Sequence, residues 1–231
     1  ASDVYKRQLK AFVSGGGALD QKIGEFLNAI GLPTLQGYGL TEASPVVSCN
    51  IPGKIKIDTV GSPFKTNQVN IAVDGEILVK GENVMLGYWN MKKETTDVIR
   101  NGWLHTGDIA RIDEDGFIFI VDRKKDMVLR GGENVYCAEV ESAIFEHEAV
   151  TEVTVFGVPD ERLGEEVAAA VYLDDTDSIN AEALRTFLQG RIAKHKIPQY
   201  LWFLQEPLPR NASGKFLKRE LQEKLIIENA S

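Results

Sequence analysis

The first part of the chain alternates apolar runs with glycine-rich turns, which is typical of a strand–helix–strand unit. The run 11–13 leads into Ser14–Gly17 and predicts a strand followed by a tight loop. A helix follows, with Asp20 as its cap and Gly31 as its stop, and then a strand that ends at 37–39. The apolar side chains at helical spacing are Ile23, Phe26, Leu27 and Ile30. One such unit cannot cover a sheet, so we expect it to expose apolar surface.

From residue 60 to residue 121 the pattern changes to short strands separated by turns. The turns contain Asp74-Gly75, Gly102 and Asp115-Gly116, which are hairpin signals. The strands are expected at Val69–Val73, Glu76–Val79, Ile109–Ile112 and Phe117–Val121. This stretch predicts a small antiparallel sheet or barrel.

After about Lys124 helical and strand patterns alternate. Helices are expected at Ala138–His147, Ala181–Lys194 and Phe216–Ile227, and strands at Val150–Val158, Val167–Leu173 and Tyr200–Leu204. Three helices and three strands make a self-contained α+β domain. We place its boundary in the charged segment 122–126.

Composition excludes several kinds of partner. The 231 residues carry 34 acidic and 26 basic side chains, a net charge of −8 that opposes nucleic acid and anionic lipid. The sequence shows no membrane-spanning apolar stretch and no secretion signal. Cys49 and Cys137 are too few for a disulfide framework, so we expect two free thiols in a reducing cytoplasm.

The first residues are set apart from the fold. Asp3–Gln8 resembles the translation of an adapter used to build sequencing libraries. On that interpretation the natural sequence starts near Leu9; the alternative is a genuine polar tail. We exclude residues 1–8 from fold reasoning.

Two glycine-rich turns, Ser14–Gly17 and Gly37–Glu42, are candidates for ligand binding, because glycines expose backbone N–H groups. Tyr38 offers a flat face for a base, Thr41 a hydroxyl for a phosphate, and Glu42 an oxygen for Mg²⁺. The alternative is that these are ordinary turns at strand ends.

Asp108, at the end of 103–108, can hold the hydroxyls of a ribose or can merely cap a turn. His105 suggests a general base, but no carboxylate or nucleophile is spaced with it. His147 and His195 are isolated, and we interpret them as structural.

Lys215, on the loop 211–215, can bring a point charge to a site or belong to a solvated basic surface.

The order of these segments resembles the adenylate-forming superfamily of acyl-CoA synthetases, luciferases and carrier-loading adenylation domains. The resemblance runs from about Ser14 to Leu221. It rests on the strings at 36–42, 75–89, 102–108, 122–136 and 209–215. It implies that a carboxylate attacks the α-phosphate of MgATP to give an acyl-adenylate, and that the thiol of coenzyme A (CoA) then displaces AMP.

The resemblance also implies roles for single residues. Tyr38 would pack on adenine, Thr41 would contact the α-phosphate, Glu42 would help to hold Mg²⁺, and Asp108 with Arg123 would bind the ribose. The pocket for adenine and the acyl end would be lined by Gly16, Gln36 and Gly37, with Gly39 in the same nucleotide-binding turn.

By the same resemblance the second domain changes orientation between the two half-reactions. Lys215 would be the adenylation lysine and Lys125 the hinge, and Gly131-Gly132 would approach the pantetheine arm of CoA. The predicted fold is thus α/β and α+β: the end of a large adenylation domain at 9–123 and a complete mobile domain at 124–231.

The sequence departs from the family's pattern at its start. The Ser/Thr/Gly-rich loop for the β- and γ-phosphates and most of the acyl pocket would lie upstream of Leu9, so we expect these 231 residues to be inactive alone. The expected substrate is a medium- or long-chain fatty acid or an aryl or branched acid; the segment 130–136 looks like that of bacterial fatty-acid ligases, which favours a fatty acid. The alternatives are an enzyme that loads a carrier protein or serves an oxygenation step, and a non-catalytic nucleotide- or CoA-binding module.

Overall fold

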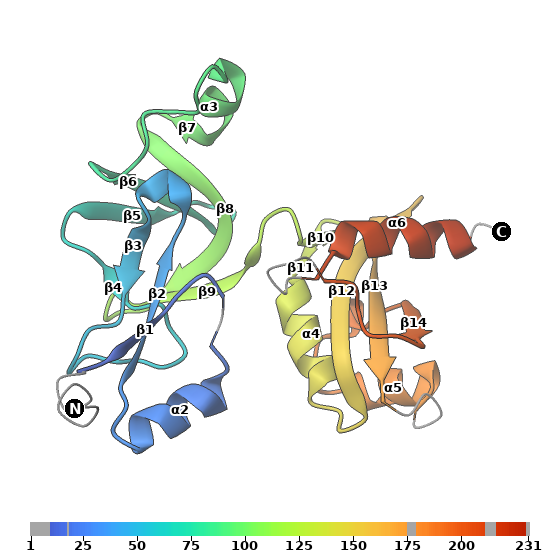
Figure 1. Cartoon of the computed structure of the whole chain (residues 1–231). Coiled ribbons are helices and arrows are strands. Elements are labelled where there is room, and N and C mark those ends of the chain that lie inside the picture. The colour runs from blue at the N-terminus through green and yellow to red at the C-terminus, as the bar shows by residue number, and fades with distance from the viewer. Residues whose placement is uncertain (1–9, 18, 175–178, 211–215, 230–231) are drawn as a thin grey trace. The chain divides into compact units, whose positions relative to one another are not determined.

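The computed structural model describes residues 10–17, 19–174, 179–210 and 216–229, and the chain divides into two units between Val121 and Asp122 (Figure 1). The division lies just before the charged segment 122–126. The domain limits drawn from the sequence stay a prediction. The α/β and α+β fold is confirmed by the elements of the two units.

The first unit contains two sheets. One has the order β1-β2-β3-β4, with β1 parallel to β2; the other has the order β5-β6-β8-β7, with β9 paired to β8. The strands are β1 Phe12–Ser14, β2 Thr34–Gly39, β3 Val46–Cys49, β4 Ser62–Pro63, β5 Asn67–Ile71, β6 Glu76–Gly81, β7 Ile99–Arg100, β8 Trp103–Ile112 and β9 Ile118–Arg123. The helices are α2 Gln21–Ala29 and α3 Lys92–Val98, with a 3-10 turn at Thr41–Ala43.

The second unit is built on a five-stranded sheet of order β11-β10-β13-β12, with β14 also paired to β13, in parallel. The strands are β10 Val128–Arg130, β11 Glu133–Val135, β12 Val150–Asp160, β13 Gly164–Leu173 and β14 Tyr200–Leu204. The helices are α4 Cys137–Phe145, α5 Ala181–Leu188 and α6 Lys218–Asn229, with a 3-10 turn at Lys194–Lys196.

Strand β13 supplies both cores of the second unit, because successive side chains of a strand face opposite ways. Val167, Ala169 and Val171 pack in the core that contains α4 and α5. Ala168 and Ala170 face the other core, where α6 packs. The sheet is therefore covered on both faces, and the run 167–171 is fully buried.

Most strongly periodic segments were predicted correctly, and the Asp20 cap is confirmed: its Oδ1 accepts the N–H of Ile23 at 3.0 Å. The helix expected at Ala181–Lys194 was wrong at its end, because α5 stops at Leu188. Gly190 follows with a φ of +81° and turns the chain out of the helix.

Several short elements were missed, among them the two-residue strands β4 and β7. The hairpin β10–β11 consists of two three-residue strands around Gly131-Gly132, too short for a period-2 pattern. Helix α3 contains no buried residue and therefore carries no apolar period. Strand β3 lies within an irregular loop sequence and is recognised only through its pairing with β2.

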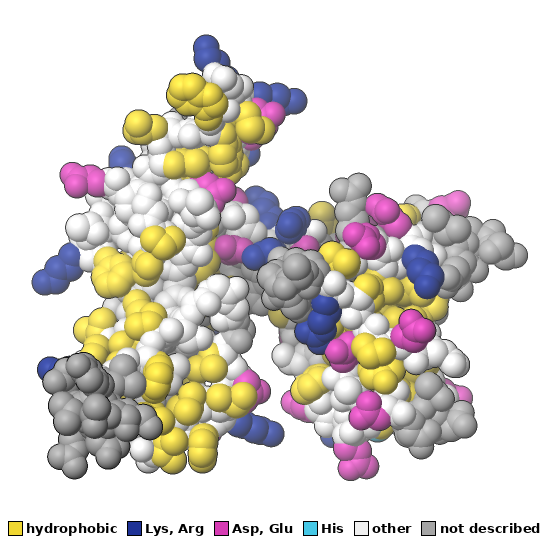
Figure 2. All heavy atoms as spheres, in the orientation of Figure 1, with side chains coloured by type: hydrophobic (Ala, Val, Ile, Leu, Met, Phe, Trp, Pro, Cys, Tyr) yellow, Lys and Arg dark blue, Asp and Glu magenta, His cyan; other side chains and the backbone are white. Residues whose placement is uncertain are grey.

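The expected exposed apolar surface is present in the first unit. The apolar side of α2 faces away from its sheet: Phe26 is 60% exposed, and Ile23 and Ile30 are more than half exposed. Figure 2 shows apolar side chains gathered over the region of α2 and β1. The buried residue of α2 is Gly24, which gives room to Ile57. In the described part of the chain no helix is long and apolar enough to cross a membrane.

We predict that trypsin cuts the chain first after Lys124 or Lys125, which are exposed in a turn near the start of the second unit. The second unit should survive as a fragment, because its sheet is covered on both faces. Gel electrophoresis and mass spectrometry of a time course would identify the products. The double variant Lys124→Gln/Lys125→Gln should remove this cut; a resistant core that begins well before Lys124 would contradict the prediction.

Candidate nucleotide-binding site

The glycines at the end of β2 are required by the neighbouring strand. A Cβ on Gly39 would lie 1.7 Å from the carbonyl oxygen of Pro45, and one on Gly37 would lie 3.1 Å from that of Ser48. These two glycines therefore let β3 approach β2, which explains them without a ligand. Gly16 differs: it has a φ of +82° and open space around its Cβ position. Of these three glycines, Gly16 therefore has the most room beside it for a ligand.

Gln36 holds the loop that precedes α2. Its Oε1 accepts the N–H of Leu19 at 3.1 Å, and its Nε2 donates to the carbonyl oxygen of Ile57. The side chain is buried, so these bonds satisfy both ends of the amide. Gln36 thus joins three segments around the first glycine turn.

Strand β8 carries a wide bulge at Thr106-Gly107-Asp108. Leu78 pairs with His105 and Glu76 pairs with Ile109, so three residues of β8 stand opposite Ile77. Gly107 has a φ of +74°, a conformation that favours glycine. Bulges re-aim side chains, and this one contains Asp108.

The buried carboxylate of Glu76 closes this bulge. Its Oε1 accepts the N–H of Gly107 at 2.9 Å, and its Oε2 lies 3.0 Å from Nδ1 of His105. The Thr106 hydroxyl adds a bond to the carbonyl oxygen of Ile77 at 2.9 Å. The statement that no carboxylate is spaced with His105 was wrong, because Glu76 is brought to it by the neighbouring strand. Through this contact His105 supports the bulge.

The two sequence motifs meet in one hydrogen bond. The phenol of Tyr38, on β2, donates to Oδ2 of Asp108, on β8, at 2.6 Å, although the residues are 70 positions apart. Both side chains are partly exposed. An aromatic ring therefore stands beside a carboxylate, the pair of groups that stacking on a base and binding of ribose hydroxyls require.

Thr41 and Glu42 follow on the 3-10 turn. Glu42 Oε1 accepts the phenol of Tyr88 at 2.7 Å, and this hydrogen bond, together with burial, raises the pKa of Tyr88. The Glu42 carbonyl oxygen accepts the N–H of Met85 at 2.8 Å. Thr41 is exposed. Among the described residues there is no group of three His, Cys, Asp or Glu side chains that could hold a metal ion.

In the second unit, Lys125 lies exposed in the turn after β9. The carbonyl oxygen of Arg123 accepts the N–H groups of Asp126 and Met127 at 2.9 and 3.1 Å and closes this turn. Gly131 and Gly132 have φ values of +59° and +87°, as a two-residue hairpin turn with positive φ at both positions requires. The backbone of Gly131-Gly132 is therefore a tight turn between β10 and β11.

Lys215 lies outside the described residues, but both sides of its loop are anchored. Arg210 and Phe216 form an antiparallel bridge, and the guanidinium of Arg210 lies 4.1 Å from the Phe216 ring centroid. Arg210 Nη2 also lies 2.7 Å from Glu152 Oε1. Lys218 Nζ lies 2.6 Å from Glu141 Oε1. Burial lowers the pKa of Lys218, but the attraction and hydrogen bond of Glu141 raise it by more, so the pKa of Lys218 is raised. Sequence reasoning missed these anchors because the carboxylates lie on other elements.

The comparisons with known proteins agree with this arrangement. The family model described as AMP-binding enzyme matches residues 2–89, and the one described as AMP-binding enzyme C-terminal domain matches residues 139–215. Long-chain-fatty-acid–CoA ligase of Bacillus subtilis is 43% identical over an alignment of 228 residues that covers 93% of this chain and 40% of that protein. 2-Succinylbenzoate–CoA ligase of a Geobacillus strain is 39% identical over an alignment of 236 residues that covers 97% of this chain and 48% of that protein.

Among solved structures, o-succinylbenzoate CoA synthetase of Bacillus subtilis with its acyl-adenylate intermediate is similar at a TM-score of 0.81 and 33% identity, over 96% of this chain and 49% of that one. The same enzyme with ATP and magnesium gives a TM-score of 0.79, 33% identity and the same coverage. The chain spans about half the length of the relatives it matches.

The fold and the family models define the class, an AMP-binding enzyme architecture with an α/β part and a small α+β part. The chain belongs to the adenylate-forming superfamily.

We predict that Glu76→Ala lowers the free energy of unfolding of the 231-residue chain by about 1–3 kcal/mol, because it leaves the buried N–H of Gly107 without an acceptor. Urea denaturation followed by tryptophan fluorescence would measure it. Glu76→Gln is the matched control, since it keeps an oxygen for Gly107 and should lose clearly less. Equal losses in both variants would show that the hydrogen bond to Gly107 is unimportant.

Proposed function

We propose that the whole protein is an acyl-CoA synthetase. It activates a carboxylic acid with MgATP to an acyl-adenylate, releasing pyrophosphate, and then transfers the acyl group to CoA, releasing AMP. The observation that carries the proposal is the hydrogen bond between Tyr38 and Asp108, which brings a base-stacking ring and a ribose-binding carboxylate together. The relatives named as CoA ligases support the choice of reaction.

In this proposal Asp108 and Arg123 hold the ribose hydroxyls, and the ring of Tyr38 packs on adenine. Thr41, exposed on its turn, contacts the α-phosphate. Glu42 supplies one ligand to Mg²⁺, which neutralises phosphate charge when it is bound. Gly16, Gln36, Gly37 and Gly39 shape the wall of the nucleotide pocket.

Bringing a carboxylate to a phosphate joins two anions, and a cation aimed at the transition state lowers that barrier. We assign this role to Lys215. Lys125 is the hinge about which the second unit reorients, which its exposed turn allows. After reorientation the Gly131-Gly132 turn approaches the pantetheine arm of CoA.

A fatty acid is the proposed substrate, because the long-chain-fatty-acid–CoA ligase is 43% identical to this chain. A carrier protein is the less favoured acceptor. The proposed location is the cytoplasm, which agrees with the free state of Cys49 and Cys137.

The activity test uses the whole protein with MgATP, a panel of fatty acids and 2-succinylbenzoate. We expect AMP release that depends on CoA and needs no carrier protein, with a fatty acid as the better substrate. Lys215→Ala is the control and should abolish adenylate formation. Release of AMP only when a carrier protein is added would overturn the choice of CoA. ATP–pyrophosphate exchange by the 231 residues alone would overturn their expected inactivity.

We predict that Asp108→Asn in the whole protein weakens AMP binding about 10- to 100-fold, because it removes a charged acceptor for ribose hydroxyls. Isothermal titration calorimetry with AMP would measure this. Asp113→Asn is a matched control: Asp113 lies in the same unit and forms an ion pair with Lys56 at 2.6 Å on a hairpin. Unchanged AMP affinity in Asp108→Asn, or an equal loss in both variants, would contradict the assignment.

A further inference from the structure

The hairpin β10–β11 is joined to its sheet by few backbone contacts. In the described part of the sheet the register of β10 with β13 consists of one residue pair, Arg130 with Gly164. By comparison, β12 and β13 pair over their whole length, from Val150 to Asp160. A short hairpin with so little pairing is held weakly by its backbone alone.

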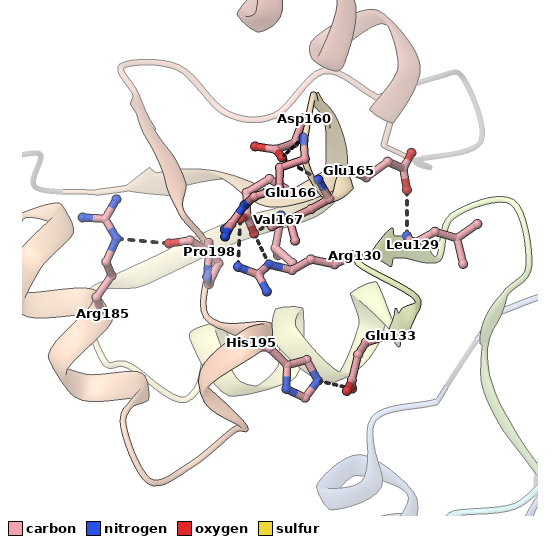
Figure 3. Close-up of polar contacts among 12 residues, drawn as sticks. Leu129, Arg130, Glu133, Asp160, Glu165, Glu166, Val167, Arg185, His195 and Pro198 are labelled. Atoms are coloured by element: carbon pink, nitrogen blue, oxygen red, sulfur yellow. Dashed lines mark hydrogen bonds and ion pairs between the residues drawn. The ribbon is translucent and has the colours of Figure 1, made fainter.

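Two adjacent glutamates on β13 bind β10 through their side chains, where backbone pairing between β10 and β13 is limited to one residue pair. Glu165 Oε2 accepts the backbone N–H of Leu129 at 2.7 Å. Glu166 binds the guanidinium of Arg130 through two bonds, Nε to Oε1 and Nη2 to Oε2, the latter at 2.9 Å. Figure 3 shows both contacts. Because adjacent residues of a strand face opposite ways, Glu165 and Glu166 hold β10 from both faces of the sheet.

The turn itself is held by the connection between β12 and β13. Gly131 donates its N–H to the carbonyl oxygen of Leu163 at 2.8 Å. Oδ1 of Asp160 fixes this connection by accepting the N–H groups of Arg162 and Leu163 at 2.9 and 2.8 Å. The Gly131-Gly132 turn is therefore attached to a rigid support.

Stability alone does not account for the Arg130–Glu166 pair. Glu166 is buried, and taking two charges out of water offsets much of their attraction, so apolar side chains would stabilise such a position at least as well. What a bidentate pair adds is orientation, because two parallel bonds fix the guanidinium in one geometry. The pair sits directly beside the turn that the proposed function brings to CoA.

We propose that Arg130 and Glu166, assisted by Glu165, are positioning residues that hold the Gly131-Gly132 turn for attack by the CoA thiol. The inference rests on the proposed function and adds residues to it. It assigns them to the second half-reaction, because in the proposed function the turn acts only after the second unit has reoriented.

The test compares Arg130→Met with the control Arg185→Met in the whole protein. Arg185 belongs to the same unit and donates to the carbonyl oxygens of Pro198 and Gln199 at 3.0 and 2.6 Å, away from the hairpin (Figure 3). Single-turnover experiments would follow adenylate formation and the transfer of a preformed acyl-adenylate to CoA separately. We expect Arg130→Met to slow transfer about 10- to 100-fold and to raise the KM for CoA, with adenylate formation changed less than about twofold. Arg185→Met should leave the ratio of the two rates unchanged.

Equal slowing of both half-reactions by Arg130→Met, or no slowing of transfer, would overturn the inference. If Arg130→Met fails to fold, Glu166→Gln, which keeps one acceptor for the guanidinium and replaces the other with an N–H donor, should show the same imbalance to a smaller degree. Amide hydrogen exchange of Gly131 in the 231-residue chain provides an independent measurement: it should rise in Arg130→Met and stay constant in Arg185→Met, and unchanged exchange would also overturn the inference. A wild-type protein that forms no CoA thioester would instead refute the proposed function.

Discussion

The buried carboxylate of Glu76 sets the position of Asp108, on which the candidate nucleotide site depends. Its two oxygens bind Gly107 and His105 and hold the β8 bulge against β6. The bulge inserts two extra residues, an even number, so the alternation of inward and outward side chains is the same on both sides of it. Leu104 and Ala110 therefore both face the core of the first unit. The bulge changes the direction of Asp108 without disturbing the packing of the sheet.

The glycines show how one pattern can arise from two causes. A glycine-rich turn at a strand end suggests close approach of a ligand, yet the contacts around Gly39 and Gly37 show that a neighbouring strand already requires them. Strand β3 thereby comes close enough to pair with β2, with Ser48 opposite Tyr38. The phenol of Tyr38 meanwhile reaches Asp108 on β8. The glycines contribute to the site indirectly, by letting the backbone close around the residues that carry the chemistry.

The parts of the fold predictable from the sequence are those with a strong period, such as the strand at Val167–Leu173 and the helix that begins at Ala181. Helix α3 has no buried residue, and the strands of the hairpin β10–β11 are three residues long, so neither element carries such a period. The same holds within the site. Tyr38 and Asp108 were both candidates, but no spacing rule relates residues 70 positions apart. Only the resemblance of motif order placed them in one site. The contact between Glu76 and His105 was found only through the pairing of β6 with β8.

The β8 bulge and the β10–β11 hairpin have the same physical design. Each contains at least one glycine with positive φ. In each, a glutamate on a neighbouring strand accepts a backbone N–H: Glu76 from Gly107, and Glu165 from Leu129. A side-chain acceptor satisfies such an N–H from within the sheet, so no additional strand has to pair with it. The backbone of each irregular segment is thereby held by a carboxylate on the adjacent strand.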